Sequence, residues 1–467
     1  IKSTDDCIIV SGILNITSTE DGIIGKDLCG VVAGDININA GSDGIKSTYD
    51  TDTTKGNVII EGGNITIKAS NDGIQAENIL VINDGTINIK TNNGAADTTQ
   101  THTDNMYMGR GGFGFNNNKT TTTTDDTVES RKGIKAGNML IINDGDITID
   151  SDDDSVHCNS EIYIYGGTIN AATGDDGVHA DDLLTVNGGT INITQCYEGI
   201  EADDIVINDG DISVVSSDDG INSSDGSITI NGGNLLINAS GDGLDANGSI
   251  IINGGYIVVL GPTSDGDTAI DYDDSCTING GTVMAFGSSG MLEIPKGASN
   301  GACIVTAFTS VSGGSKYTLS DSNGNEILSY TPSKAYAAAI VYSDKITTGN
   351  TYDITAGSTT LSIEVTSDVT SNVSSGLGKA GGMNKPGNGG SGMHNNGSSF
   401  RSIITSVFSE VAYIGFNIEA EQKLVENIVG KPLAAHGIIS VGIEKTKAAD
   451  WERTKVKYNL PEDYLLY

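Results

Sequence analysis

The strongest constraint on this chain is a repeat of about 22 residues that runs through its first 290 positions. Two signatures alternate in each repeat. One is an acid followed by glycine and an aliphatic residue, as in Asp72-Gly73-Ile74. The other is a glycine turn followed by alternating residues, as in Asn83-Asp84-Gly85-Thr86-Ile87-Asn88-Ile89. A short, fixed period is typical of solenoids, in which each repeat packs only on its neighbours.

The residues within one repeat predict β-structure. An Ile-x-Ile pattern points both isoleucines to the same face of a strand. Asn-Gly-Gly and Asn-Asp-Gly supply the positive φ angle that a tight corner needs. Coils of equal length stack in register, so like residues form columns about 4.8 Å apart, with aliphatic columns inside and Asn or Thr ladders at the surface. We therefore predict an all-β fold whose residues 1–290 form a right-handed parallel β-helix.

The remaining segments break this pattern. Residues 94–131 form an insertion rich in Thr, Asn, Gly and Met, and the repeat resumes after it at Lys132-Gly133-Ile134 without a change of register. We therefore expect a flexible loop rather than a domain boundary. Short alternating runs in residues 291–373 predict a small antiparallel β-sandwich that caps the last coil. Residues 374–399 have the composition of a linker, and residues 400–467 predict a short α/β tail of unknown role.

Composition narrows the classes of partner. The net charge of −36 argues against nucleic acid and favours cations, or ligands reached through cations. Aromatic residues make up only 5% of the chain, which suits a solenoid better than a conventional globular core. No stretch is long and apolar enough for a transmembrane segment. Because Ile1 already lies inside the repeat, we expect the natural N-terminus to lie upstream, and we expect a secreted or cell-surface protein.

The repeat register assigns most of the six cysteines to the core. Cys7, Cys29 and Cys276 occupy a position that other coils fill with leucine or isoleucine, and Cys158 occupies an alanine position. These four therefore resemble small buried hydrophobes. Cys7 and Cys29 lie one coil apart, which is close enough for a disulfide, and the sequence leaves both states open.

Columns of acids are the strongest functional signal. Stacked carboxylates about 5 Å apart repel one another, and solvent exposure or a divalent cation relieves the repulsion. Calcium accepts about six to eight oxygen ligands in irregular geometry, so a carboxylate ladder suits it. We therefore predict calcium ligands among Asp153, Asp154, Asp175, Asp176, Glu198, Glu201, Asp203, Asp218, Asp219, Asp242 and Asp245. A weaker group comprises Asp267, Asp271, Asp273 and Asp274.

Simpler interpretations compete with this one. Any single Asp before a glycine is more often a turn residue that bonds its own backbone. His157 and His179 lie one coil apart in one column, so their rings could stack. A transition-metal pair would need further ligands that the sequence does not place, so an ordinary surface column is the preferred interpretation.

The acidic and Asn-Gly-Gly coils, the glycine-rich insertion and the following sandwich together resemble a bacterial family of secreted carbohydrate-binding β-helix proteins. The resemblance covers about residues 1–370 and implies a fold similar to that of the calcium-dependent pectate lyases. It also implies bound calcium and affinity for plant cell-wall polysaccharide such as polygalacturonate. The carboxylates of a lyase-like calcium site match Asp218, Asp219, Asp242 and Asp245 by motif. The tail after Ser399 has no counterpart in the resemblance.

Three functions remain open at this point. The leading hypothesis is a non-catalytic, calcium-dependent protein of the bacterial surface that binds acidic polysaccharide. A polysaccharide lyase would need a lysine or arginine to remove the α-proton, with Lys46, Lys132 and Lys135 as candidates. Because the segment from Asp152 to Asp245 contains no lysine or arginine, we name no catalytic residue. The third hypothesis is a structural surface or adhesin solenoid that calcium only stabilises.

Overall fold

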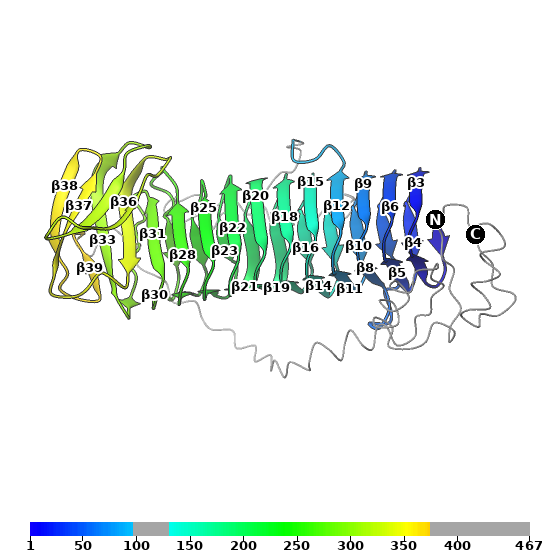
Figure 1. Cartoon of the computed structure of the whole chain (residues 1–467), viewed down its shortest axis with the longest axis horizontal. Coiled ribbons are helices and arrows are strands. Elements are labelled where there is room, and N and C mark those ends of the chain that lie inside the picture. The colour runs from blue at the N-terminus through cyan, green and yellow to red at the C-terminus, as the bar shows by residue number, and fades with distance from the viewer. Residues whose placement is uncertain (97–129, 374–467) are drawn as a thin grey trace, which may run out of the picture.

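The computed structural model describes residues 1–96 and 130–373, which form a parallel β-solenoid with an antiparallel cap (Figure 1). Each full coil contributes three strand segments, so the solenoid has three columns of parallel strands. The described residues contain no helix, so none of them could span a membrane as a helix. The predicted all-β class with a parallel β-helix is confirmed. The linker at 374–399 and the α/β tail at 400–467 lie outside the described residues, as does most of the insertion.

Within a coil, the first-column strand follows the acidic tripeptide, and the second-column strand follows the next corner. The first comprises β1 (Lys2–Ser3), β4 (Ile23–Gly25), β7 (Ile45–Ser47), β10 (Ile74–Ala76), β13 (Ile134–Ala136), β16 (Val156–Cys158), β23 (Ile221–Ser223), β26 (Leu244–Ala246) and β29 (Ile270–Tyr272). The second comprises β2 (Cys7–Ile9), β5 (Leu28–Val31), β8 (Asn57–Ile60), β11 (Ile79–Ile82), β14 (Met139–Ile142), β17 (Glu161–Ile164), β24 (Ile228–Ile230), β27 (Ser249–Ile252), β30 (Ser275–Ile278) and β32 (Gly297–Ala298). Two long strands, β19 (Val178–Val186) and β21 (Ile200–Ile207), run through both columns and join them into one sheet.

The third column follows the glycine turn and forms the second large sheet. It comprises β3 (Ile13–Ser18), β6 (Asp35–Ala40), β9 (Asn64–Ala69), β12 (Thr86–Thr91), β15 (Asp146–Ser151), β18 (Thr168–Thr173), β20 (Thr190–Cys196), β22 (Asp211–Ser216), β25 (Asn234–Asn238), β28 (Tyr256–Leu260) and β31 (Thr282–Gly287). The strands pair in the register that the repeat predicts, with Ile87 between Ile65 and Ile147.

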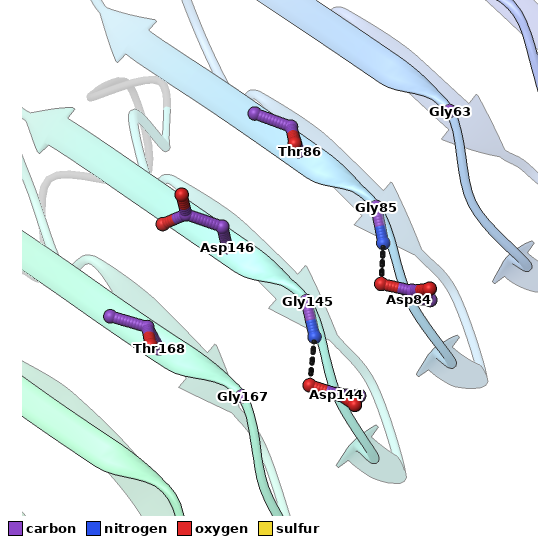
Figure 2. A pocket seen from close by; sticks show the side chains of 9 residues that line it. All are labelled: Gly63, Asp84, Gly85, Thr86, Asp144, Gly145, Asp146, Gly167 and Thr168. Carbon is purple, nitrogen blue, oxygen red and sulfur yellow. Dashed lines mark hydrogen bonds between the residues drawn. The ribbon is translucent and has the colours of Figure 1, made fainter.

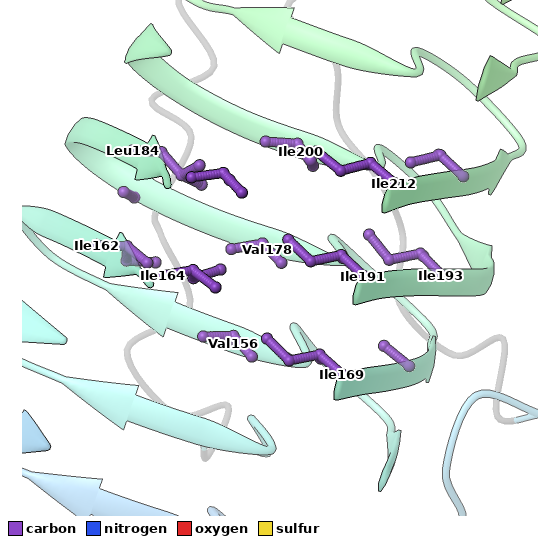
Figure 3. Packing of buried hydrophobic residues seen from close by; sticks show 14 of the residues in the cluster. Val156, Ile162, Ile164, Ile169, Val178, Leu184, Ile191, Ile193, Ile200 and Ile212 are labelled. Carbon is purple, nitrogen blue, oxygen red and sulfur yellow. The ribbon is translucent and has the colours of Figure 1, made fainter. Parts of the chain in front are cut away.

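The core is a set of aliphatic columns inside the three walls. In β6 the side chains alternate between exposed and buried, with the isoleucines inside. Figure 3 shows Ile169 and Ile191 stacked in successive coils, with Val156 and Val178 opposite them. Each coil therefore buries only a thin slice of apolar surface, and the stack makes a continuous core without many aromatic residues.

Two different requirements explain the glycines at the corners. In the Asn-Asp-Gly turn, Gly85 has φ of 126°, as the turn chemistry predicts. The glycine of the acidic tripeptide has no positive φ; glycine is required there because a Cβ atom would clash with neighbouring atoms. A Cβ on Gly73 would lie 2.4 Å from Ile89 Cγ2 and 2.5 Å from the Gly133 carbonyl oxygen. This tripeptide is therefore a close-packing site and not a positive-φ turn.

Polar ladders and the cysteines follow the predicted columns. Asn143 Nδ2 donates to Asn83 Oδ1 at 2.6 Å. Tyr165 interrupts this column, and a second ladder beyond it joins Asn208, Asn231, Asn253 and Asn279. All six cysteines are buried free thiols. Cys7 in β2 and Cys29 in β5 lie opposite each other in adjacent coils, as part of an aliphatic column.

The solenoid passes the insertion without a register change, because β10 pairs directly with β13, with Ile74 opposite Ile134. At the other end, the last third-column strand pairs with the cap in antiparallel fashion. The cap strands that continue this sheet are β36 (Tyr336–Ser343), β33 (Ala302–Val311) and β39 (Val369–Ser371). A separate antiparallel sheet contains β35 (Glu326–Tyr330), β34 (Tyr317–Asp321), β37 (Thr351–Ala356) and β38 (Thr359–Glu364).

Strand β36 closes the solenoid because both of its faces are buried. Ile340 and Tyr342 pack into the solenoid core, whereas Val341 packs into a second core. That second core lies between the extended sheet and the separate four-stranded sheet, and it includes Phe286 and Tyr317. Buried aromatic side chains are thus concentrated in this second core, whereas the solenoid core is almost entirely aliphatic.

Candidate metal-binding edge

The acids of the tripeptides lie in one column at the corner between the third-column and first-column strands, which we call the acidic edge. In five pairs of neighbouring coils, one carboxylate oxygen accepts the backbone N–H of the equivalent acid in the next coil. The pairs are Asp21 with Asp43 (3.2 Å), Asp43 with Asp72 (3.0 Å), Asp154 with Asp176 (3.1 Å), Asp176 with Glu198 (3.2 Å) and Asp219 with Asp242 (2.6 Å). These bonds give the accepting acids a structural role and leave the second oxygen of each for other partners.

In one stretch of the edge, which we call the paired segment, the acids are neutralised by basic side chains. Lys132 occupies the column position of the acid, and its Nζ lies 2.9 Å from Asp153 Oδ1 and 2.5 Å from Asp154 Oδ2. Arg131 Nη1 lies 2.7 Å from Oδ2 of the buried Asp152. Although the segment from Asp152 to Asp245 contains no lysine or arginine, the preceding coil supplies both cations to these acids.

Burial makes the Lys132 ion pairs electrostatically strong. Burial alone would lower the pKa of Lys132, but Asp154 and Asp153 raise that pKa well above its ordinary value. Burial alone would likewise raise the pKa of Asp154, but Lys132, followed by His157 and His179, holds it well below its usual range. Lys132 is therefore held as a cation and Asp154 as an anion.

The next stretch, which we call the histidine segment, consists of Asp176, His179 and Glu201. His179 Nδ1 lies 3.1 Å from Asp176 Oδ2 and 3.2 Å from Glu201 Oε2. Burial alone would lower the pKa of His179, but its hydrogen bond to Asp176 and the nearby carboxylates raise it to about 10. Burial raises the pKa of Glu201 to about 7, although His179 opposes this shift.

The two histidines differ in their surroundings. His157 Nδ1 lies 2.8 Å from Asp154 Oδ2, and its Nε2 lies 2.8 Å from Asn159 Oδ1. The His157 and His179 rings meet edge to face, with centroids 4.9 Å apart, so they do not stack in parallel. Both side chains belong to hydrogen-bonded networks at the edge, and neither is the ordinary surface residue that the sequence analysis preferred.

Further along the edge lies what we call the all-carboxylate segment, made of Asp219, Asp242 and Asp245. One oxygen from each carboxylate lies within 4.8 Å of the others. Burial, together with Asp218 and Asp245, raises the pKa of Asp219 to about 8. Burial also raises the pKa of Asp242 to about 9. The hydrogen bond from the Thr268 N–H lowers this pKa, and the charge of Asp219 raises it. Within the described residues, no lysine, arginine or histidine forms a salt bridge with Asp219 or Asp242.

The other predicted ligands lie around these three segments, with one exception. Asp175 joins Asp153 and Asp154, and burial followed by the charge of Asp176 raises its pKa to about 8. Glu198 accepts a hydrogen bond from Asn222 Nδ2 at 2.9 Å, and burial followed by Glu201 raises its pKa to about 9. Asp203 Oδ1 accepts a hydrogen bond from Ser224 Oγ at 3.0 Å. Asp203 lies on the opposite side of the first column and belongs to none of the three segments.

A second polar surface, which was not predicted from the sequence, lies at the Asn-Asp-Gly corner. Figure 2 shows a shallow groove there, lined by Asp84, Asp144, Asp146, Thr86, Thr168 and the corner glycines of four coils. Asp84 Oδ1 accepts the N–H of Gly85 at 2.7 Å, and Asp144 repeats this bond one coil later. The signal that could have revealed the groove is that two consecutive coils carry the Asn-Asp-Gly triplet at this corner, where it otherwise recurs only singly, at Asn208-Asp209-Gly210.

Comparison with known proteins places the chain in a family. The model of one family matches residues 1–177 and again residues 175–375, which together span most of the chain. Searches of curated proteins and of solved structures found no match. With two matches that cover the solenoid and its cap, the chain belongs to the family of carbohydrate-binding domain-containing proteins.

Proposed function

We propose that this protein binds acidic polysaccharide through calcium held at the all-carboxylate segment. The single observation that carries the proposal is the convergence of Asp219, Asp242 and Asp245 within 4.8 Å of one another. Family membership supports a glycan as the partner. Such glycans lie outside the cell, so we also propose a secreted or surface-bound protein, and the earlier resemblance suggests a bacterial source.

The donor set of this segment fits calcium. All three side chains offer oxygen, which is the ligand that calcium prefers, and calcium tolerates irregular geometry. The raised pKa values of Asp219 and Asp242 mean that the anionic forms are disfavoured when no cation is present. A bound calcium ion would compensate the carboxylates and offer coordination positions to the uronate groups of a polymer. Because calcium would bridge the two, an acidic protein could then bind an acidic ligand.

Binding is better supported than cleavage. A lyase base must be unprotonated to accept the α-proton of the substrate. Lys132 is held as a cation between two carboxylates, and Lys46 forms an ion pair of 2.7 Å with Asp43. Lys135 Nζ lies 3.9 Å from Asp72 Oδ2 and 3.2 Å from Ser130 Oγ. We therefore infer a binding protein, with a lyase as the alternative.

Isothermal titration with polygalacturonate tests the proposal. We expect binding in calcium, none after chelation, and at least a tenfold loss of affinity in Asp242→Asn. Asn at this position keeps the oxygen that accepts the Thr268 N–H and removes only the charge. Asp203→Asn is the matched control, because Asp203 lies outside the three clusters, and it should bind as the wild type does.

Three outcomes would contradict the proposal. Equal binding with and without chelator would remove calcium from the function. Absorbance from unsaturated product ends during incubation with uronans would identify a lyase. A rise in melting temperature with calcium, combined with no binding to uronans or neutral glucans, would favour a purely structural solenoid.

A further inference from the structure

We propose that the histidine segment binds a first-row transition metal ion, with Zn²⁺ as the probe, through His179 Nδ1, Asp176 Oδ2 and Glu201 Oε2. The three ligand atoms lie within 4.8 Å of one another. His179 lies in β19 and Glu201 in β21, where the two residues are direct partners in the register. The proposed site therefore joins two consecutive coils.

The spacing of the donor atoms fits a small ion. Zinc binds imidazole nitrogen and carboxylate oxygen at about 2.0–2.2 Å, so two ligands of a tetrahedral site lie about 3.3 Å apart. The observed distances from His179 Nδ1 are 3.1 Å to Asp176 and 3.2 Å to Glu201. A proton on Nδ1 points at one of these oxygens at a time, whereas a metal ion contacts both. Three protein ligands leave a fourth position for water.

The surroundings orient the ligands as a metal site requires. Histidine ligands usually direct their second ring nitrogen to a carboxylate or carbonyl group, which fixes the orientation of the ring. His179 Nε2 faces Asp181 Oδ1 at 3.5 Å. Asp176 is held by its other oxygen, which accepts the Glu198 N–H at 3.2 Å. Both His179 and Asp176 are therefore held with one donor atom directed at the proposed site.

The local charge balance favours a cation. Around His179 lie the carboxylates of Asp154, Asp176 and Glu201. Lys132 pairs with Asp153 and Asp154, and among the described residues only His179 forms a salt bridge with Asp176 or Glu201. One imidazolium carries a single positive charge against these two acids. A divalent ion supplies the missing charge within the same space.

The imidazole ligand separates this site from the proposed calcium site. Calcium selects oxygen donors, whereas imidazole suits zinc and its neighbours. The two metals should therefore occupy different parts of the edge, calcium at Asp219, Asp242 and Asp245 and the transition metal at His179. Neither proposal depends on the other.

The test is titration of Zn²⁺ into the full chain in a buffer with excess calcium, which occupies the oxygen sites, and without glycan. We expect one Zn²⁺ per chain by calorimetry and by metal analysis after dialysis. His179→Gln and Glu201→Gln should each weaken binding by at least about 100-fold. Asp181→Asn, which acts on ring orientation, should cost about 10- to 100-fold. His157→Gln is the matched control in the same column and should retain the ion.

Two results would overturn the proposal. One is the absence of stoichiometric Zn²⁺ binding, which would leave His179 as a protonated partner of Asp176 and Glu201. The other is a folded His179→Gln or Glu201→Gln variant that binds Zn²⁺ as the wild type does. Circular dichroism and the melting temperature establish folding. Should His179→Gln not fold, Glu201→Gln and Asp181→Asn decide the question.

Discussion

The paired segment and the all-carboxylate segment are built from the same repeat, yet they solve the problem of stacked acids differently. In the paired segment Lys132 replaces the acid of one coil and neutralises Asp153 and Asp154 of the next. In the all-carboxylate segment every coil keeps its acid, and burial raises the pKa values of Asp219 and Asp242. One segment carries its cations in the chain, whereas we propose that the other takes its cation from solution.

Removing the internal cation should have the largest effect. Lys132→Gln leaves two carboxylates without their ammonium partner, and the loss of one partner of a buried ion pair costs about 3–5 kcal/mol. We expect this loss in the free energy of unfolding by urea. Lys316→Gln is the control, because it removes one ion pair, with Glu326, in which the two side chains are 54% and 49% exposed. It should cost far less, because solvent screens exposed ion pairs. Equal losses in the two variants would contradict the claim that the buried ion pairs of Lys132 stabilise the paired segment more than an exposed pair does.

Calcium should stabilise only the all-carboxylate segment. At a concentration 100 times its dissociation constant, a ligand that binds the folded state adds about 2.7 kcal/mol. We expect calcium to raise the melting temperature of the wild type, and of Asp153→Asn. The Asp242→Asn variant should show almost no calcium effect. A calcium shift that persists in Asp242→Asn but disappears in Asp153→Asn would move the site to the paired segment.

The pH dependence without calcium should be the smallest effect. A carboxylate whose pKa is raised on folding contributes stability that is present below its ordinary pKa and lost as the pH rises through the folded value. For Asp219 and Asp242 this window runs from about 4 to about 8 and 9. We expect a decline of the order of 1 kcal/mol across it, because solvent screens these partly exposed groups.

The double variant Asp219→Asn with Asp242→Asn tests this pH dependence. Thermal unfolding in chelator at pH 5, 7 and 9 should show a smaller decline for the double variant than for the wild type. Saturating calcium should also reduce the decline in the wild type, because the bound ion favours the anionic forms. A wild-type protein that becomes more stable from pH 5 to pH 9 in chelator would contradict the prediction.

Much of the fold was predictable because each residue contacts its equivalent one period away. Ile87 lies between Ile65 and Ile147, and Cys7 lies against Cys29, as the aligned repeats predict. The positive φ of Gly85 also follows from its turn signature. The constraint on Gly73 did not follow, because it comes from Ile89 and from the backbone of the next coil.

The candidate site was predictable only in part. The repeat places Asp154, Asp176 and Asp242 in one column, and the structure shows that column as a ladder. The repeat did not reveal that Lys132 would neutralise two of the predicted ligands, Asp153 and Asp154, because Lys132 precedes them by one coil in the sequence. It also left His179 without further ligands, whereas in the structure Asp176 and Glu201 both lie next to its Nδ1 atom.

The sequence by itself therefore determined which residues share a column, because a constant coil length makes spacing along the chain equivalent to stacking in space. Only the tertiary structure decided which charges meet. That outcome depends on burial and on the direction of individual side-chain atoms, such as Lys132 Nζ toward Asp154 and His179 Nδ1 toward Glu201. These directions are set by packing between coils, which the repeat pattern does not encode.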